Sequence, residues 1–151
     1  MMYYTHLAFG FLLAFLSLKF FSIENLLLFF TGIFIGSLFV DIDNFKSKIG
    51  RKTLGISLML QFVFGHRGIF HTLIFSFLLF AVLYFLNLSF AYGFFIGYFS
   101  HLVIDSFNIQ GVRLFYPFNK YNFRCFVRVN SFTEKLIFIA LILVDGYLYI
   151  F

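Results

Sequence analysis

Charged residues and cysteine are both scarce in this chain. Only 11% of its 151 residues are Asp, Glu, Lys or Arg, whereas 62% are hydrophobic. A water-soluble domain is typically about 45–50% apolar, so this composition predicts an integral membrane protein. The one cysteine, Cys125, excludes an intrachain disulfide and a cysteine-based zinc knuckle. Candidate metal ligands must therefore come from histidines and carboxylates.

The chain also lacks the pattern of a signal peptide. No basic residue precedes the first apolar run and no small-residue cleavage site follows it, so we expect this run to remain in the protein as a span. The 29 Phe residues are interpreted as lipid-facing bulk, which says little about function.

Long stretches without formal charge predict where the chain crosses the membrane, since one crossing needs about 20 apolar residues. The stretch 68–104 is nearly twice that length, and Asn87-Leu88-Ser89 near its middle predicts a turn that divides it. The apolar run 53–64 is only about half a crossing and predicts a short interfacial or re-entrant helix. We expect one all-α membrane domain over 1–151, with about five transmembrane helices at approximately 3–18, 25–40, 69–86, 90–105 and 135–151.

Basic residues predict the orientation of these spans. One predicted loop holds Lys46, Lys48, Arg51 and Lys52, a second holds Arg113, Lys120, Arg124, Arg128 and Lys135, and the 87–89 hairpin holds none. Short loops rich in Lys and Arg stay on the cytoplasmic side. The sequence therefore predicts a multi-pass protein of the inner (plasma) membrane with a cytoplasmic N-terminus.

All four histidines and three of the six acidic residues lie at or near the ends of the uncharged stretches. Taken singly, a histidine at an interface is more often a hydrogen-bonding anchor, and a carboxylate there often marks where a helix leaves the lipid. Ionisable groups in spans are costly, however, and tend to face a shared interior. The predicted topology puts all seven at cytoplasmic ends, and together they form a candidate metal site: His6, Asp41, Asp43, His66, His71, His101 and Asp105.

Spacing within the spans supports this prediction. His101 and Asp105 are four residues apart, so one helix face presents both to a single ion. Two GxxxG motifs, Gly32 with Gly36 and Gly93 with Gly97, predict close helix packing, although glycine is also simply frequent in membrane helices.

Several short blocks occur in order along the chain. They are Thr5-His6, Asp41-x-Asp43, His66-Arg67-Gly68-x-x-His71-Thr72, Gly97-x-x-Ser100-His101-x-x-x-Asp105 and Gly111-Val112-Arg113-Leu114-Phe115-Tyr116-Pro117-Phe118. Together these blocks resemble the YdjM-type family of inner-membrane-associated metal-dependent hydrolases. The resemblance implies a helical membrane protein with a His/Asp metal centre, distantly similar to the zinc-dependent phospholipase C and nuclease superfamily. It does not supply a substrate.

The candidate ligands predict a type of chemistry. Imidazole and carboxylate without thiolate suit Zn²⁺, with Mn²⁺ or Fe²⁺ as alternatives, and seven candidates are enough for two ions. A two-metal site activates water and clamps the oxygens of a phosphoester. In such a site Asp41 or Asp43 would bridge the metals or accept a proton. Arg67 would contact phosphate oxygens through its planar fork, or else anchor the chain at the membrane surface.

We therefore expect a hydrolase of a phosphoester, lipid-linked ones included, at the cytoplasmic face. The alternative is a metal-ion transporter, or a metal sensor or structural protein without catalysis. Transport favours ionisable groups at several depths, and only Asp145 is deep. The expected partners are membrane lipids and the substrate, and no nucleic acid, because membrane embedding accounts for the net charge of +5. The basic, aromatic segment 111–130 is either a topology signal or a surface that rests on the anionic leaflet.

Overall fold

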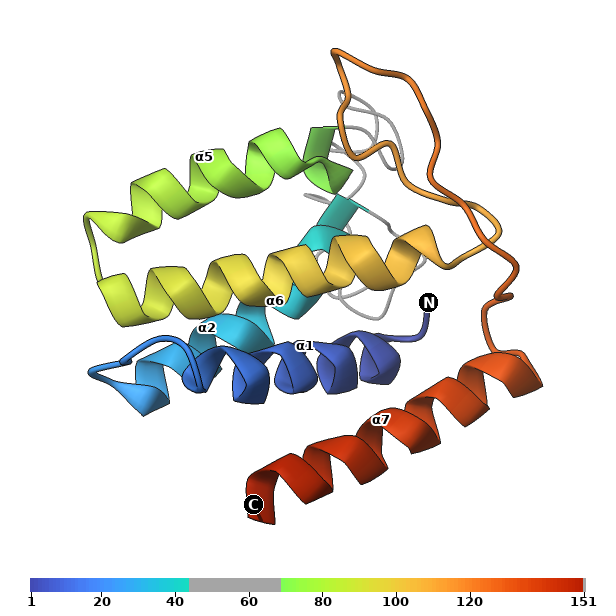
Figure 1. Cartoon of the computed structure of the whole chain (residues 1–151). Helices are drawn as coiled ribbons and strands as arrows, with labels where there is room; N and C mark the ends of the chain where they lie inside the picture. Colours follow the sequence, from blue (N-terminus) through green and yellow to red (C-terminus); the bar gives the residue numbers. More distant parts are fainter. Residues whose placement is uncertain (44–68, 151) are drawn as a thin grey trace.

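The structure, a computed structural model, describes residues 1–43 and 69–150. Within these ranges the chain forms five α-helices and two short 3-10 helices, with isolated β-bridges and no strand (Figure 1). The predicted all-helical class is thereby confirmed, and the predicted short helix at 53–64 lies outside the described residues. The elements are α1 (Tyr3–Leu18), α2 (Leu26–Phe39), η1 (Val40–Asp43), η2 (Ile69–His71), α5 (Leu73–Tyr84), α6 (Leu88–Ser106) and α7 (Phe132–Ile150).

Three helices begin at a polar residue that caps the first turn. The side chains of Asn25, Thr72 and Asn87 each accept a hydrogen bond from the backbone N–H three residues later, at the start of α2, α5 and α6. Such caps satisfy amides that would otherwise lack a partner. Because Asn87 caps α6, the break between α5 and α6 falls at residues 85–87 rather than at the predicted 87–89.

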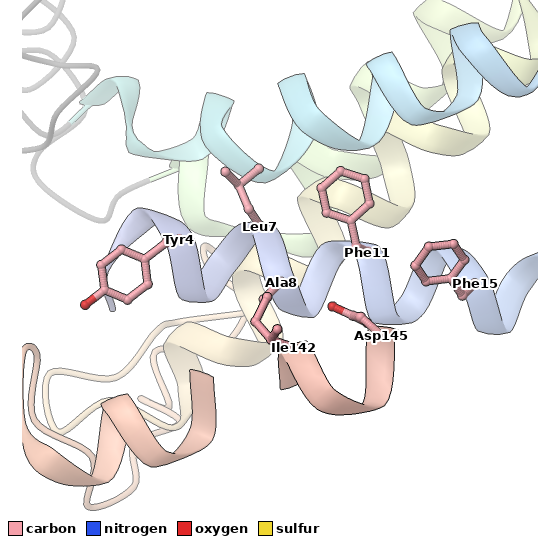
Figure 2. A pocket seen from close by; sticks show the side chains of 7 residues that line it. All are labelled: Tyr4, Leu7, Ala8, Phe11, Phe15, Ile142 and Asp145. Atoms are coloured by element: carbon pink, nitrogen blue, oxygen red, sulfur yellow. The ribbon is translucent and has the colours of Figure 1, made fainter. Parts of the chain in front are cut away.

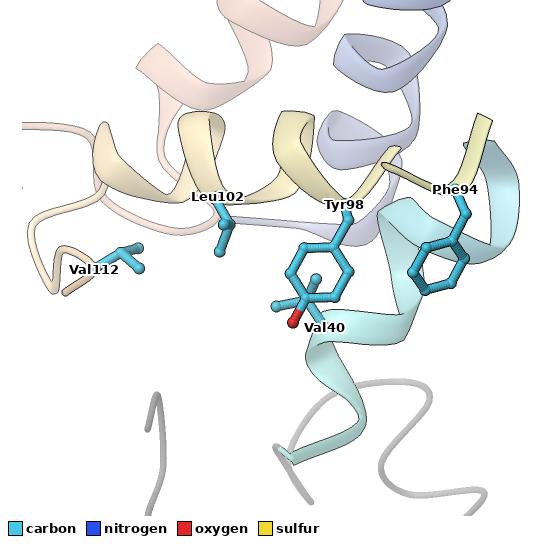
Figure 3. Close-up of a cluster of buried hydrophobic side chains, with 5 residues drawn as sticks. All are labelled: Val40, Phe94, Tyr98, Leu102 and Val112. Atoms are coloured by element: carbon cyan, nitrogen blue, oxygen red, sulfur yellow. The ribbon is translucent and has the colours of Figure 1, made fainter. Parts of the chain in front are cut away.

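Helix α6 forms the centre of the bundle and packs against α1, α2 and α5 (Figure 1). One buried apolar cluster joins α6 to the end of α2 and to the segment after α6 (Figure 3). Its members are Val40, Phe94, Tyr98, Leu102 and Val112. This cluster holds the ends of α2 and α6 together, next to the polar residues described below.

Of the described helices, only α6 is both long enough and apolar enough to cross a membrane. Helices α1, α2 and α5 are apolar but shorter. Helix α7 has 19 residues, and its apolar sequence is interrupted by Glu134, Lys135 and Asp145. The predicted number of spans therefore remains a prediction.

Helix α7 packs against α1 and leaves an apolar groove of about 330 Å³ between them (Figure 2). The groove is lined by Tyr4, Leu7, Ala8, Phe11, Phe15, Ile142 and Asp145. Asp145 thus lies among apolar and aromatic side chains of α1 and α7, and it belongs to neither of the His/Asp groups described below.

Candidate metal centre

Glycines bring α2 and α6 into backbone contact beside the candidate site. A Cβ atom on Gly32 would lie 2.5 Å from the Phe90 carbonyl oxygen of α6, and one on Gly93 would meet the Phe29 carbonyl of α2. Gly36 and Gly97 are equally close to the opposite backbone, at Phe94 and Ile33. The predicted packing role of both GxxxG motifs is confirmed. It places Ser37, which follows Gly36, against His101, which lies one turn after Gly97.

The contact with Ser37 fixes the tautomer of His101. Its Nδ1 lies 2.7 Å from the Ser37 carbonyl oxygen. A carbonyl oxygen only accepts hydrogen bonds, so Nδ1 carries the proton, and the neutral ring keeps a lone pair on Nε2. A metal-binding histidine typically donates its other ring N–H to a carbonyl or carboxylate in this way.

Two carboxylates face this lone pair of His101. Nε2 lies 3.7 Å from Asp105 Oδ2 and 4.0 Å from Asp41 Oδ1, and it has no hydrogen-bond partner. Both distances are longer than a hydrogen bond, so a proton added to Nε2 would have no acceptor within hydrogen-bond distance at either carboxylate. A buried His101 Nε2 without a hydrogen-bond partner, close to two carboxylates, fits a bound cation, because an unpaired buried polar atom is otherwise costly.

Asp105 also lies close to His6 and His71, the other two histidines that the structure describes. His6 Nε2 is 3.5 Å from Asp105 Oδ1, and His71 Nε2 is 3.9 Å from Oδ2. The rings of His6 and His101 stack with centroids 3.8 Å apart, and neither ring nitrogen of His6 has a hydrogen-bond partner. The Met1 ammonium also donates to Asp105 Oδ1, at 2.7 Å. Asp105 is only 2% exposed, so these groups surround a buried carboxylate.

Two groups of three residues could each hold an ion. They are His6, Asp41 and His101, and His71, His101 and Asp105, and in each group the ligand atoms lie within 4.8 Å of one another. Five of the seven predicted ligands are thus brought together by α1, η1, η2 and α6. The set of imidazoles and carboxylates fits zinc, and also manganese or iron. His66, Arg67 and the side chain of Asp43 lie outside the described residues.

Two positioning contacts were missed by the sequence analysis. The Tyr98 hydroxyl donates to the Phe70 carbonyl and so ties η2, which carries His71, to α6. The Ser37 carbonyl orients His101. A backbone carbonyl gives no signal in a sequence, whereas Tyr98 lies three residues before His101 and could have been noticed as a polar group on the same helix.

Known proteins that resemble this chain identify its family. A family model described as YdjM inner membrane protein matches residues 1–150. The chain belongs to the YdjM family. The uncharacterized protein YvsG of Bacillus subtilis (strain 168) is 33% identical over 116 residues, which is 75% of this chain and 72% of YvsG. The inner membrane protein YdjM of Escherichia coli (strain K12) is 36% identical over 84 residues, as is that of Shigella flexneri, covering 51% of this chain and 43% of theirs. No solved structure matches.

Membership of the YdjM family supports a location in the inner membrane. The similarity to the two YdjM proteins covers less than half of their length, so properties of those whole proteins do not transfer with it. Chemistry at the His/Asp cluster must be argued from this chain's own residues.

Proposed function

We propose that this chain is a membrane-bound, metal-dependent hydrolase that acts on a phosphoester, lipid-linked ones included, at the cytoplasmic face of the inner membrane. The observation that supports this most directly is the lone pair of His101 Nε2, which faces Asp41 and Asp105 without a hydrogen bond. The proposal includes a multi-pass topology with the N-terminus in the cytoplasm, because the basic loops favour that orientation.

One of the two groups of three among the five clustered residues would hold the ion, with zinc as the first candidate and manganese or iron as alternatives. When bound, such an ion lowers the pKa of a water ligand and polarises a phosphoryl oxygen. His101 has one ring nitrogen left after its bond to Ser37, so only one of the two groups of three can use it at a time. A second ion would need ligands from Asp43 and His66.

The exposure of the two clustered carboxylates suggests different roles. Asp105 is 2% exposed and enclosed by imidazoles, whereas Asp41 is 19% exposed, so water can reach it. We assign Asp41, with Asp43 as the neighbouring candidate, to accept the proton of the attacking water. Asp105 orients the histidines. Arg67 is assigned to the phosphoryl oxygens because a guanidinium contacts two of them at once.

Metal content of purified protein tests the ligand set. His101→Asn keeps a side-chain N–H at the place of Nδ1, so it can still donate to Ser37, but it has no atom at the place of Nε2. We expect this variant and Asp105→Asn to lose most of the bound metal while still inserting into the membrane. Asp145→Asn is the matched control, because it removes a carboxylate outside the cluster and should retain the metal.

Hydrolysis is then measured on a panel of phosphomonoesters and phosphodiesters, lipid ones included, with chelated and metal-restored protein. Asp41→Asn should lower the rate by about 10²–10⁴-fold, as expected for loss of a general base, without comparable loss of stability. Arg67→Lys should also lower the rate, because the charge remains but the planar fork is lost.

Metal uptake into proteoliposomes without hydrolysis of any panel member would instead favour the transporter alternative. Unchanged metal content in His101→Asn and Asp105→Asn would refute the site itself.

A further inference from the structure

The segment 107–131, which joins α6 to α7, is folded rather than a plain linker. Backbone bridges pair Asn108 with Val127 and Val112 with Phe123. Val112 and Val127 are each only 1% exposed. The Leu114 carbonyl accepts a hydrogen bond from the Leu73 N–H at 2.9 Å, which ties the segment to the start of α5. Its outward side chains are therefore held on a fixed backbone.

Residues 123–128 alternate between inward and outward side chains, as in an extended strand. Val127 is buried, and Phe123 and Cys125 are partly buried. Arg124, Phe126 and Arg128 are exposed, and Phe126 is 75% exposed. A phenyl ring thus stands between two guanidinium groups on the outer side.

The rest of the segment has the same character. Phe118 is 88% exposed and Tyr121 63%, and Arg113 and Lys120 are exposed as well. No acidic residue occurs between Asp105 and Glu134, so the segment carries four positive charges and no negative one. Exposed aromatic rings interleaved with basic groups are poorly suited to open water but well suited to the headgroup region of a bilayer.

The position of the segment agrees with that environment. It follows the C-terminal end of α6, the described helix with the length and composition of a membrane span. A segment that leaves such a helix lies at the level of the lipid headgroups. Phosphate is the group that guanidinium contacts best, through two parallel hydrogen bonds.

We propose that an outward surface of this segment binds acidic phospholipid headgroups of the leaflet in which α6 ends. The surface consists of Arg113, Phe118, Lys120, Arg124, Phe126 and Arg128. Its basic groups contact headgroup phosphates, and its phenyl rings lie at the boundary with the acyl chains. This inference needs neither a metal nor hydrolysis, so it can fail or succeed independently of the proposed function.

Lipid preference can be measured with a fluorophore near the surface but outside it. Val129→Cys in a Cys125→Ser background provides one labelling position, 48% exposed in the native chain. The full-length protein is placed in phosphatidylcholine nanodiscs that contain phosphatidylglycerol. Quenching by quencher-bearing phosphatidylglycerol is compared with quenching by quencher-bearing phosphatidylcholine, and the ratio of the association constants gives the preference.

We expect a preference for phosphatidylglycerol that falls about fivefold for each basic residue removed, as attraction to an anionic leaflet implies. Arg124→Gln with Arg128→Gln should therefore lower the ratio by about 25-fold, with Arg113 and Lys120 accounting for the preference that remains. Lys19→Gln removes an exposed charge that follows the C-terminal end of α1 and lies outside the proposed surface. This control should leave the ratio unchanged. Equal quenching by both lipids in the native sequence would overturn the proposal. So would a preference that is unchanged in the double variant, or displacement of the lipid by a DNA duplex added in solution.

Discussion

Glu134 is a buried carboxylate whose two oxygens both accept hydrogen bonds from the protein. Oε1 accepts from the Met2 N–H at 2.6 Å and from the Thr5 hydroxyl at 3.3 Å, and Oε2 accepts from the Asn130 N–H at 2.6 Å. Because Thr5 directly precedes His6, these bonds fix the first turn of α1 against the start of α7. Glu134 is therefore a positioning residue for the cluster rather than one of its candidate ligands.

Glu134→Gln tests this role. The amide replaces one acceptor oxygen by an NH₂ group that faces another donor, and we expect the free energy of unfolding to fall by about 1–3 kcal/mol. Thermal unfolding in detergent measures the loss, and metal bound per folded molecule should stay unchanged. Lys135→Gln, at the neighbouring exposed position, should leave both quantities unaltered. If Glu134→Gln lost its metal at full stability, Glu134 would be a ligand.

At the scale of single residues, the sequence predicts which side chains are involved better than what they contact. The spacing of His101 and Asp105 predicts a shared face because helix geometry is local. Which oxygen of Asp105 lies near His6, His71 or His101 depends on how separate helices pack. Spacing along the chain does not predict that packing. The tautomer of His101 depends on a backbone carbonyl of another helix.

At the scale of helices, the backbones of α2 and α6 are in contact because each helix has glycines where it faces the other. The Phe29 carbonyl of α2 occupies the space that a side chain on Gly93 would need, and the Phe94 carbonyl of α6 does the same at Gly36. Association of helices in lipid relies on such close contact, because apolar burial contributes little between helices there. The same contact sets the spacing between Asp41, after α2, and His101, on α6.

Gly93→Ala should therefore separate the two helices. The added methyl group would overlap the Phe29 carbonyl, and we expect about 1–3 kcal/mol of destabilisation, with weaker metal binding as a second effect. Gly146→Ala is the control, because nothing lies within 4 Å of a Cβ atom there. Since alanine favours a helix over glycine, that variant should be neutral or up to about 1 kcal/mol more stable. Equal effects of both variants on thermal unfolding would contradict the packing argument.

Helix positions were more predictable than helix boundaries. Charge-free length and polar caps such as Asn25 and Asn87 are local signals, so each of the five predicted spans contains a described helix. Helix α5, with 12 residues, is shorter than the predicted 69–86 because η2 and the Thr72 cap take up its start. The fold of 107–131 was not predicted, because its two bridges join residues 11 and 19 positions apart without a regular strand pattern.

At the scale of the whole molecule, the five candidate ligands that the structure describes gather at one end of the bundle. The start of α1, the end of α2, η2 and the end of α6 meet there, whereas the connections α1–α2 and α5–α6 lie at the other end (Figure 1). Large apolar side chains remain exposed along α5 and α7, among them Phe77, Leu78 and Leu143. Surfaces of this kind are suited to lipid rather than water.

The topology of the bundle yields the last prediction. Reporter fusions after Phe45 and after Lys120 should report the cytoplasm, because most of the basic residues lie in those two loops. A fusion in the turn at residues 85–87, which has no basic residue, should report the opposite side. This fusion is a strict test of whether α5 crosses the membrane. Helix α5 has only 12 residues, which is about 18 Å of helix, whereas the hydrocarbon core is about 30 Å thick. If this turn and the Lys46–Lys52 loop reported the same side, α5 and α6 would not both cross, and a common cytoplasmic end for His71 and Asp41 would have to be abandoned.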